Sequence, residues 1–378
     1  MKTTPNMRVA FVLPGLHLVN RGAEAAFEAI ARELAAMPGV DVTLIGAGEP
    51  RDNTPYRFLQ AGLIPREKFR RWPSFPPFRT EYRYEELTFI KGLWRVYDPA
   101  AYDAVLTCSY PFVQWALRAK KKKGKRPALI FVTENGDWAA RRLNMEYRFF
   151  NCDGLVCTNP EYYRRHEHTF KSALIPNGID VAAFSPGPDV REDMNLPKAS
   201  PLILMVSALI PSKHPAAGIR AAAKIPGAAL VIAGNGPLHE ECDALGKELM
   251  GERYQRVTLP ADQMPNLYRS ADVLLHMSRE EAFGNIYIEA AACGLPVVAH
   301  DYETPRWILN ELGLFVDSSN EDAVTDALRN AIAKKHEGQP ADTHEQLARR
   351  FAWTVVAGQY HDFLRRILNP TENGSDHE

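Results

Sequence analysis

Hydrophobic and polar positions along the chain alternate between the period of a strand and the period of a helix. The apolar run Arg8–Leu13 ends at a Pro-Gly pair, as a buried parallel strand would, and helical periodicity follows over Ala23–Met37. Further apolar runs predict strands of the same sheet: Val40–Ile45, Ala104–Thr107, Ala128–Thr133 and Gly154–Thr158. Because strands that alternate with helices are joined by right-handed crossovers, this half is predicted to contain a parallel sheet.

The same alternation starts again in the second half of the chain. Strands are predicted at Leu202–Val206, Ala228–Ile232, Val273–His276 and Pro296–Ala299, and helices at Ala216–Lys224, Leu238–Met250 and Asn285–Cys293. Asn177–Arg191, rich in proline and glycine, separates the halves, and amphipathic Arg349–Leu368 predicts a last helix with Trp353 in a core. The predicted fold class is α/β, with two Rossmann-like domains that would bind a ligand in a cleft at the carboxyl ends of their strands.

The composition is that of an ordinary globular protein. The 378 residues are 46% hydrophobic and 24% charged, and this length favours two domains. No run approaches the roughly 20 apolar residues of a membrane span, and no signal-peptide pattern precedes Pro14. The five cysteines include no Cys-x-x-Cys pair, so they are predicted to be reduced thiols of a cytoplasmic protein.

Charge is distributed unevenly along the chain, although the formal net charge is only -1. Residues 1–180 hold 27 Lys and Arg against 19 Asp and Glu, whereas residues 181–378 hold 18 against 27. A basic half indicates an anionic partner. No helix-turn-helix, zinc-finger or RNA-recognition signature accompanies the charge, so nucleic acid is not a predicted partner. An anionic substrate or membrane surface is favoured, and an uneven distribution without function stays open.

Two basic segments of the first half are candidates for membrane contact. Leu63–Tyr97 is rich in aromatic and basic residues, which suits peripheral contact with the anionic inner face of a membrane. The same segment could instead form an acceptor pocket, or a packed insertion with solvated arginines. The run Lys120–Lys123 is either a solvated loop or a second point of attraction to anionic lipid.

No motif indicates a bound metal. The sequence has no His-Glu-x-x-His motif and no Cys/His cluster with the spacing of metal ligands. His166 and His168 stand two residues apart on a predicted helix, so their side chains face different directions. We therefore expect neither a metal nor another cofactor.

The strongest chemical signal is the segment Ser278–Pro296, SREEAFGNIYIEAAACGLP. Glu281 and Glu289 flank a Phe-Gly-Asn turn that starts the helix predicted from Asn285. The N–H groups at a helix start form a site suited to a diphosphate. Glu289, about one turn inside the helix, can accept two hydrogen bonds from the vicinal hydroxyls of a ribose. Glu281, before the turn, would lie on the sugar side of the phosphates.

These residues resemble the E-x7-E signature of retaining glycosyltransferases of the GT-B fold, specifically the large family 4. Other segments that are similar to the family's motifs occur in the same order along the chain: Arg21-Gly22-Ala23-Glu24, Ile175–Asp180, Val206–Lys213, Gly234–Pro237, Leu267–Asp272 and Ala292–Ala299. The resemblance covers most of the chain and is dense from about residue 175 to 300. An ordered set of this kind is far more specific than one pair of glutamates.

The resemblance implies a donor-binding role for each matching residue. Gly22 would bring loop amides close to the donor diphosphate, and Lys213 would pair with the phosphates. Glu281 would act as a catalytic residue in contact with the donor sugar, and Glu289 would bind the ribose. Backbone amides that would hold the sugar and phosphate belong to Phe283, Gly284 and Asn285.

The resemblance also implies the reaction. Sugar transfer with retention in this family is described as a front-face reaction, in which the leaving diphosphate oxygen takes the acceptor proton. Catalysis then rests on orientation and charge stabilisation, without a protein nucleophile or a bound metal. The partners would be a nucleotide-sugar donor and a hydroxyl acceptor, which is a glycan, a lipid-linked saccharide or a natural product.

The chain departs from the family pattern in two places. Ala208 stands where the family has an arginine that faces the diphosphate, and Arg279 is the nearest replacement in the sequence. The second departure is the absence of the histidine that often follows a first-domain strand near the acceptor.

Four residues of the first half are candidates for the acceptor side. In place of the missing histidine, Glu134 or Asn135 would contact the acceptor, and Asp137 is a second catalytic candidate. These residues could instead form a loop that caps the following helix. His17, in the loop after the first predicted strand, would point towards the cleft if the fold is that of the family.

The sequence thus predicts a retaining, metal-independent hexosyltransferase. An acceptor-binding domain is expected over residues 1–180 together with a helix at about 355–369 that crosses back to it. A nucleotide-sugar domain is expected over 181–354, followed by a flexible tail over 370–378. A nucleotide-sugar epimerase, a disaccharide phosphorylase and a non-catalytic nucleotide-sugar binding protein are the alternatives.

Overall fold

The chain folds into two compact units. The computed structural model describes residues 7–119, 124–143, 145–337 and 342–369, so the run Lys120–Lys123 and the predicted tail lie outside the described residues. Unit 1 holds the residues up to Gly178 and those from Trp353 onward, and unit 2 holds Ile179–Ala352. The chain therefore leaves unit 1 once and returns to it.

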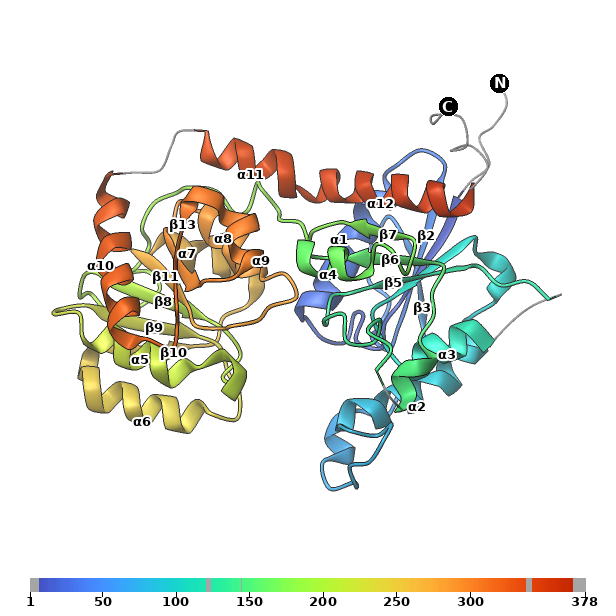
Figure 1. The fold of residues 1–378 in the computed structure, drawn as a ribbon, viewed down its shortest axis with the longest axis horizontal. Helices are drawn as coiled ribbons and strands as arrows, with labels where there is room; N and C mark the ends of the chain where they lie inside the picture. Colours follow the sequence, from blue (N-terminus) through green and yellow to red (C-terminus); the bar gives the residue numbers. More distant parts are fainter. Residues whose placement is uncertain (1–6, 120–123, 144, 338–341, 370–378) are drawn as a thin grey trace. The chain divides into compact units, whose positions relative to one another are not determined.

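Unit 1 is built on a parallel sheet, which has seven strands within the described residues (Figure 1). Its strands are β1 (Met7–Val12), β2 (Val40–Gly46), β3 (Arg57–Gln60), β4 (Ala104–Thr107), β5 (Ala128–Val132), β6 (Gly154–Cys157) and β7 (Ser172–Leu174). Their spatial order is β3-β2-β1-β4-β5-β6-β7, so the direction of winding reverses between β1 and β4. In doubly wound sheets a ligand binds at the carboxyl ends of the strands beside such a reversal.

Helices cover both faces of this sheet. The helices of unit 1 are α1 (Gly22–Ala35), α2 (Glu81–Val96), α3 (Phe112–Ala119), α4 (Pro160–His166) and α12 (Trp353–Leu368), with short 3-10 turns η1 (Arg66–Phe69), η2 (Pro99–Ala101) and η3 (Met145–Phe149). Apolar residues of α1 and α12, including Phe27 and Tyr360, pack on one face of the sheet. Those of α2 and α3, including Phe89 and Val113, pack on the other.

Unit 2 repeats the doubly wound arrangement. Its six described strands are β8 (Leu202–Val206), β9 (Ala229–Ala233), β10 (Tyr254–Val257), β11 (Val273–His276), β12 (Val297–His300) and β13 (Gly313–Val316). All pairs are parallel, in the order β10-β9-β8-β11-β12-β13. The reversal lies between β8 and β11, so the loops that follow these two strands frame the expected ligand site.

The helices of unit 2 again divide between the two faces. They are α5 (Pro215–Ala223), α6 (His239–Met250), α7 (Met264–Arg269), α8 (Asn285–Ala292), α9 (Glu303–Leu309), α10 (Glu321–Glu337) and α11 (Thr343–Phe351), with 3-10 turns η4 (Pro211–Lys213), η5 (Gly251–Arg253), η6 (Ala261–Gln263) and η7 (Asn310–Leu312). Helices α5, α6 and α10 share one core with the sheet, and α7, α8, α9 and α11 share the other.

The last predicted helix, Arg349–Leu368, is two helices in the structure, and this corrects the prediction. Helix α11 ends at Phe351 and α12 begins at Trp353. Between them Ala352 forms a parallel bridge with Ile179, whose N–H donates to the Phe351 carbonyl at 2.7 Å. The Phe351 carbonyl therefore has a hydrogen-bond partner outside α11. The amphipathic pattern of Arg349–Leu368 continues across the break between α11 and α12, which is also where unit 2 ends.

Packing at this boundary explains Trp353. The indole is partly buried against the core of unit 1, and a Cβ added to Gly178 would lie 2.4 Å from one of its carbons. The predicted core role of Trp353 is confirmed. The five cysteines are free thiols, and four of them are buried. None of the described helices combines the length and the apolar character that crossing a membrane requires.

Candidate functional site

The loops after β8 and β11 bring together a lysine, a glutamate and a histidine. Lys213, in η4, hydrogen-bonds to the carboxylate of Glu281 and lies 3.4 Å from the Ser278 hydroxyl. His276, the last residue of β11, places Nε2 2.7 Å from Oε1 of the same carboxylate. All three side chains are largely buried, with 18%, 17% and 4% exposed for Lys213, Glu281 and His276. The structure thus places two predicted residues, 68 positions apart, in direct contact.

These contacts keep Glu281 ionised. Burial alone would raise the pKa of this carboxyl, but the hydrogen bond and charge of His276, together with Lys213, outweigh burial and lower the pKa to about 2. At neutral pH Glu281 is therefore a carboxylate that accepts hydrogen bonds and has no proton to donate.

The Phe-Gly-Asn turn before α8 has a left-handed backbone at its glycine, which other residues rarely adopt. Gly284 has a φ of 90°, and a Cβ there would lie 2.6 Å from the Tyr287 ring. The Phe283 side chain is buried near Trp307 and Phe351, so a ligand would meet the backbone of this residue and not its ring. Gly284, the N-cap residue of α8, has no side chain that could cap the first turn. The start of α8 has the polarity that binds an anion.

Glu289 lies on α8 and is held by a tyrosine. The Tyr268 hydroxyl, from α7, donates to Glu289 Oε2 at 2.7 Å. Burial raises the pKa of Glu289, and the hydrogen bond from Tyr268 partly offsets this. The same burial raises the pKa of the Tyr268 phenol, so this hydroxyl remains a hydrogen-bond donor. The second carboxylate oxygen is the atom that a ligand hydroxyl would contact.

The segment that departs from the family pattern lies against a glycine loop. A Cβ on Gly234 would lie 1.9 Å from the Ser207 carbonyl oxygen, and one on Gly236 would lie 2.4 Å from the Leu209 carbonyl oxygen. Both glycines are required by this close backbone approach. Ala208, between Ser207 and Leu209 in the sequence, is exposed.

Arg279 lies in a different group of side chains. Arg279 is exposed. Burial is the largest cause that lowers the pKa of His214, and the charges of Arg279 and His300 lower it further. Hydrogen bonds from Ser319 lower the pKa of Asp317, and the charges of His300 and Arg279 lower it slightly further. Among the described residues no hydrogen bond joins Arg279 to Lys213 or to Glu281, so its predicted part in donor binding stays a prediction.

In unit 1 the loop between β1 and α1 also depends on a close approach. A Cβ on Gly15 would lie 2.0 Å from Oε1 of Glu24, a residue that is only 9% exposed and whose pKa burial raises. Gly22 begins α1 and differs, because a Cβ there would meet nothing within 4 Å. Protein packing alone therefore does not require glycine at position 22.

Glu134, which follows β5, is a buried carboxyl with an incomplete set of partners. Its Oε2 accepts from Asn177 Nδ2 at 2.9 Å, whereas its buried Oε1 has no hydrogen-bond partner within the described residues. Burial raises the pKa of Glu134 to about 7, against the lowering effect of Asn177 and with a further rise from nearby Glu24. Near neutral pH this side chain can therefore either donate or accept a proton.

Asp137, three residues later, has a complete set of partners. Arg141 Nε donates to Oδ1 at 2.9 Å, His166 Nε2 lies 2.9 Å from Oδ2, and Arg165 also donates to Oδ2. The side chain is 1% exposed. Burial opposes ionisation of Asp137, but these partners lower its pKa. This arrangement favours a structural role and gives no support to the prediction that Asp137 is catalytic.

The other two acceptor candidates make local contacts. Nδ1 of His17 lies 2.8 Å from the Glu49 carbonyl oxygen, and Nε2 lies 3.1 Å from the Tyr56 hydroxyl. The imidazole ring stacks on Phe58. Both ring nitrogens are therefore used in packing the loop after β1. Asn135 is exposed, and its side chain donates weakly to Cys108 Sγ at 3.7 Å.

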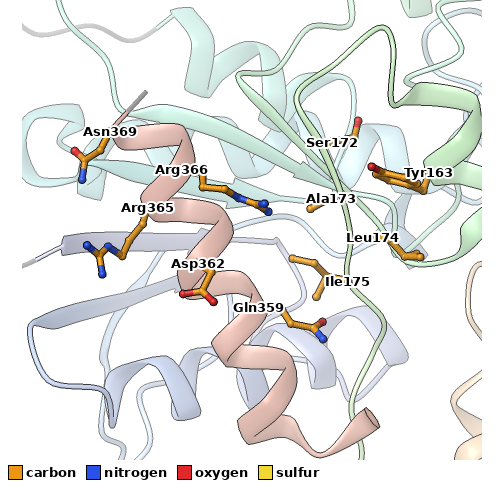
Figure 2. A pocket seen from close by; sticks show the side chains of 10 residues that line it. All are labelled: Tyr163, Ser172, Ala173, Leu174, Ile175, Gln359, Asp362, Arg365, Arg366 and Asn369. Carbon is orange, nitrogen blue, oxygen red and sulfur yellow. The ribbon is translucent and has the colours of Figure 1, made fainter. Parts of the chain in front are cut away.

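A hollow of about 750 Å³ in unit 1 contains none of the predicted site residues. Figure 2 shows its lining from β7, from Tyr163 on α4 and from α12, with Arg366 pointing towards Ala173 and Arg365 on another side of the helix.

Two functional candidates in unit 2 are missed by the sequence analysis. His276 and Tyr268 contact the predicted glutamates directly. His276 precedes Glu281 by five residues and ends a predicted strand, which is a signal that a sequence can supply. Nothing in the sequence points Tyr268 towards Glu289, because that contact depends on how α7 packs on α8.

Solved structures share this fold over nearly the whole chain. A sucrose-phosphate synthase from Thermosynechococcus elongatus superposes with a TM-score of 0.79 at 21% identity, covering 97% of this chain and all of the other. Anabaena Alr3699/HepE, solved in complex with UDP-glucose, has a TM-score of 0.71 at 15% identity, covering 95% of this chain and 99% of the other. Two doubly wound α/β domains of this kind define the GT-B class of fold.

Family membership follows from the sequence comparisons. The family described as Glycosyltransferase Family 4 matches residues 20–183, and that described as Glycosyl transferases group 1 matches residues 188–350. The two matches together span most of the chain, which belongs to this glycosyltransferase family. The family resemblance and the predicted fold class are both confirmed.

Curated relatives match part of the chain. A GDP-mannose-dependent alpha-(1-6)-phosphatidylinositol monomannoside mannosyltransferase of Mycolicibacterium smegmatis is 32% identical over 177 residues, which is 42% of this chain and 46% of that protein. The lipopolysaccharide core biosynthesis glycosyltransferase LpsE of Rhizobium meliloti is 25% identical over 66% of this chain and 74% of its own length. The match thus spans about half the length of the mycobacterial relatives.

Proposed function

We propose that this protein transfers a sugar from a nucleotide-diphosphate sugar to a hydroxyl acceptor, with retention of the anomeric configuration. The observation that carries the proposal is the contact of Lys213 and His276 with Glu281 at the sheet reversal of unit 2, beside the start of α8. In a member of this glycosyltransferase family, that arrangement offers a cation, an ionised carboxylate and a helix N-terminus to one ligand.

The nucleotide half of the donor would bind along α8. The diphosphate would lie at the turn formed by Phe283, Gly284 and Asn285, with Lys213 as its cation. Glu289, held through one oxygen by Tyr268, would accept hydrogen bonds from the ribose hydroxyls with the other. Gly22 would let a second backbone segment approach the diphosphate, since nothing in the protein's own packing occupies the space beside it. The charge that stabilises the leaving group would come from these residues without a metal.

Glu281 would act on the donor sugar as a hydrogen-bond acceptor. Its low pKa means that it orients sugar hydroxyls and offers negative charge to the developing positive charge at the anomeric carbon. Lys213 would divide its hydrogen bonds between Glu281 and the diphosphate, which would fix the distance between sugar and phosphate. His276 would position Glu281 from the other side.

The reaction would proceed on one face of the sugar. The bond between the anomeric carbon and the diphosphate oxygen breaks, and the bond to the acceptor oxygen forms on the same face. The proton of the acceptor hydroxyl passes to the departing diphosphate oxygen, so nucleoside diphosphate and glycoside are the products. Orientation and charge stabilisation supply the rate enhancement.

On the acceptor side Glu134 is the stronger of the two carboxyl candidates. Its unpaired Oε1 can take a hydrogen bond from an acceptor hydroxyl, whereas both oxygens of Asp137 are already used. We assign Glu134 to orienting the acceptor and Asp137 to holding its loop.

A thermal-shift screen tests the donor site. The panel contains UDP, GDP, ADP, CDP and dTDP and their common sugar conjugates, beginning with GDP-mannose and UDP-glucose because the names of relatives and solved neighbours contain them. A ligand at about 100 times its Kd adds roughly 2.7 kcal/mol of stability, which raises the melting temperature visibly. The expected result is a shift with one nucleotide base. The shift should be much smaller in Glu289→Ala and unchanged in Glu280→Ala, which replaces an exposed glutamate in the loop before α8.

No shift with any nucleotide would overturn the proposal in favour of a non-catalytic or degenerate site. A shift without product, when the donor that binds is incubated with glycan, lipid-linked and small-molecule acceptors, would leave a nucleotide-sugar binding protein. Product with the opposite anomeric configuration, read by NMR, would refute the retaining mechanism alone.

A further inference from the structure

Exposed large apolar side chains are concentrated in one stretch of unit 1. Among the described residues ten such side chains are more than a third exposed, and eight of them lie between residues 64 and 149. These eight are Ile64, Trp72, Phe75, Leu87, Trp94, Leu143, Met145 and Phe149. Single exposed apolar residues are normal on a protein surface, but a cluster of this kind marks an interaction site.

A chain of ring contacts links the two ends of this stretch. Starting at Trp72, rings follow one another at centroid distances of 5.0, 4.5, 5.2, 5.8 and 6.3 Å, through Tyr84, Phe78, Phe112 and Trp115 to Phe149. The exposed rings of Trp72 and Phe149 are thus linked by ring contacts, through Tyr84, which is buried, and through three partly exposed rings. We call this chain of rings the aromatic face; it contains Trp72, Phe78 and Tyr84 of the predicted membrane segment Leu63–Tyr97, and Phe149 of η3.

Beside Phe149 the surface is hollowed and lined by arginines. A pocket of about 620 Å³ is lined by Trp115, Arg118, Arg142, Arg148, Phe149, Phe150 and Asn151. Arg118 donates to the Phe149 carbonyl at 2.8 Å, Arg148 lies 4.8 Å over the Phe149 ring, and Arg142 lies 4.8 Å over the Phe170 ring.

These three arginines form no ion pairs with other described residues. Within the described part of the chain none of them has a carboxylate within salt-bridge distance. Neighbouring arginines differ, because Arg79 pairs with Glu146 and Arg126 pairs with Asp153. The pocket is therefore a local concentration of positive charge that an anion would complement.

The occupant must satisfy the apolar rim as well as the charge. A free phosphate would pair with the arginines but would leave Leu143, Met145 and Phe149, each about half exposed, in water. An anionic phospholipid satisfies both, because its phosphate suits the guanidinium groups and its acyl chains suit the rim.

We propose that the aromatic face, with the pocket of Arg118, Arg142 and Arg148, is a docking surface for a bilayer that contains anionic phospholipid. The arginines bind lipid phosphate, and the exposed aromatic and aliphatic side chains enter the interface. All residues of this surface belong to unit 1, and none of them is assigned to the donor.

Vesicle co-sedimentation of the full chain tests this. Vesicles of phosphatidylcholine alone are compared with vesicles that carry about one third phosphatidylglycerol. We expect binding to the anionic vesicles, weakened by salt, and about 25-fold weaker binding for Arg142→Gln/Arg148→Gln, since one basic residue contributes roughly a factor of five at such a surface. Arg118 is kept because it holds the Phe149 carbonyl. The control Arg329→Gln/Arg349→Gln removes the same charge from exposed positions of unit 2 and should bind like the parent.

Further variants separate a charge effect from damage to the fold. Arg142→Lys/Arg148→Lys should restore most of the binding, and Phe149→Ala should weaken it in a way that salt does not change. Equal binding to both kinds of vesicle, or full binding by Arg142→Gln/Arg148→Gln, would overturn the proposal. A rise in melting temperature with inorganic phosphate, lost in the glutamine pair and without vesicle binding, would assign the pocket to a soluble anion and refute the membrane surface.

Discussion

Two largely buried glutamates, Glu281 in unit 2 and Glu134 in unit 1, differ in the direction in which their surroundings shift the carboxyl pKa. Glu281 in unit 2 lies between Lys213 and His276, and its pKa is lowered to about 2. Glu134 in unit 1 has one amide donor, from Asn177, and its pKa is raised to about 7. Burial raises the pKa of both groups, and the charged partners of Glu281 reverse that effect for Glu281 alone.

The contrast separates two kinds of chemical work. A carboxylate that stays ionised at physiological pH is suited to hold and polarise a donor sugar. A carboxyl that titrates near neutrality is suited to exchange hydrogen bonds with an acceptor hydroxyl, and its behaviour changes with pH. Four variants break or sharpen this comparison.

The largest effect is expected from Glu281→Ala. Loss of the preorganised carboxylate should lower the transfer rate by about 10²–10³-fold or more, while nucleotide affinity stays nearly intact. Steady-state turnover and nucleotide titration on the same preparation measure the two quantities. Glu280→Ala, at the exposed neighbouring position, is the matched control. Turnover at the parent level in Glu281→Ala would remove Glu281 from the active site.

Glu134→Gln should change how stability depends on pH. The folded pKa of Glu134 lies above its ordinary value of 4.5, so the folded state holds the proton more tightly. Its contribution to stability is therefore full below about pH 4.5 and is lost as the pH rises through about 7. Between pH 4.5 and 8 the parent should lose about 3 kcal/mol relative to Glu134→Gln.

Urea unfolding at a series of pH values measures that difference. Glu240→Gln, whose side chain is 91% exposed in the parent, should follow the parent curve. Parallel curves for the parent and Glu134→Gln would show that Glu134 does not titrate near neutrality.

Glu289→Ala should weaken nucleotide binding by roughly 1.5–3 kcal/mol, the range for hydrogen bonds to a charged group. Calorimetric titration with the nucleoside diphosphate measures it. The matching 2′-deoxynucleotide should bind the parent more weakly and the variant no differently. If both proteins discriminate the two nucleotides equally, Glu289 does not contact the ribose.

The smallest effect is expected from Tyr268→Phe. This change removes the hydroxyl that orients Glu289 but keeps the ring, so nucleotide affinity should fall by about 1 kcal/mol. The same effect should vanish in a Glu289→Ala background, because the two residues would act through one contact. Additive losses in the double variant would show that Tyr268 acts elsewhere.

Much of the fold was accessible to sequence reasoning because central parallel strands are buried on both faces and read as apolar runs. The predicted strands at residues 104–107, 202–206 and 273–276 coincide with β4, β8 and β11. The edge strands β3, β7, β10 and β13 were not predicted. They are three or four residues long, and β3 and β10 mix charged and apolar side chains because an edge is partly solvated.

The candidate site divides in the same way. The motif around Glu281 and Glu289 was predicted because its residues lie close together in the sequence, on one turn and one helix. The partners of these glutamates, His276 and Tyr268, and the opposite environments of Glu134 and Asp137 were not predicted. Hydrogen bonds between side chains on different elements depend on packing, which one sequence does not display.

By itself, then, the sequence determined the alternation of strands and helices, the division into two doubly wound halves, and the motifs that mark the family. These features are local, since they depend on hydrophobic period and on glycine and proline at turns. The tertiary structure alone decided which carboxyl is ionised, which titrates near pH 7, and which arginines form no ion pair. Charge in a protein is set by distance and burial, and both arise only when segments far apart in the chain come together.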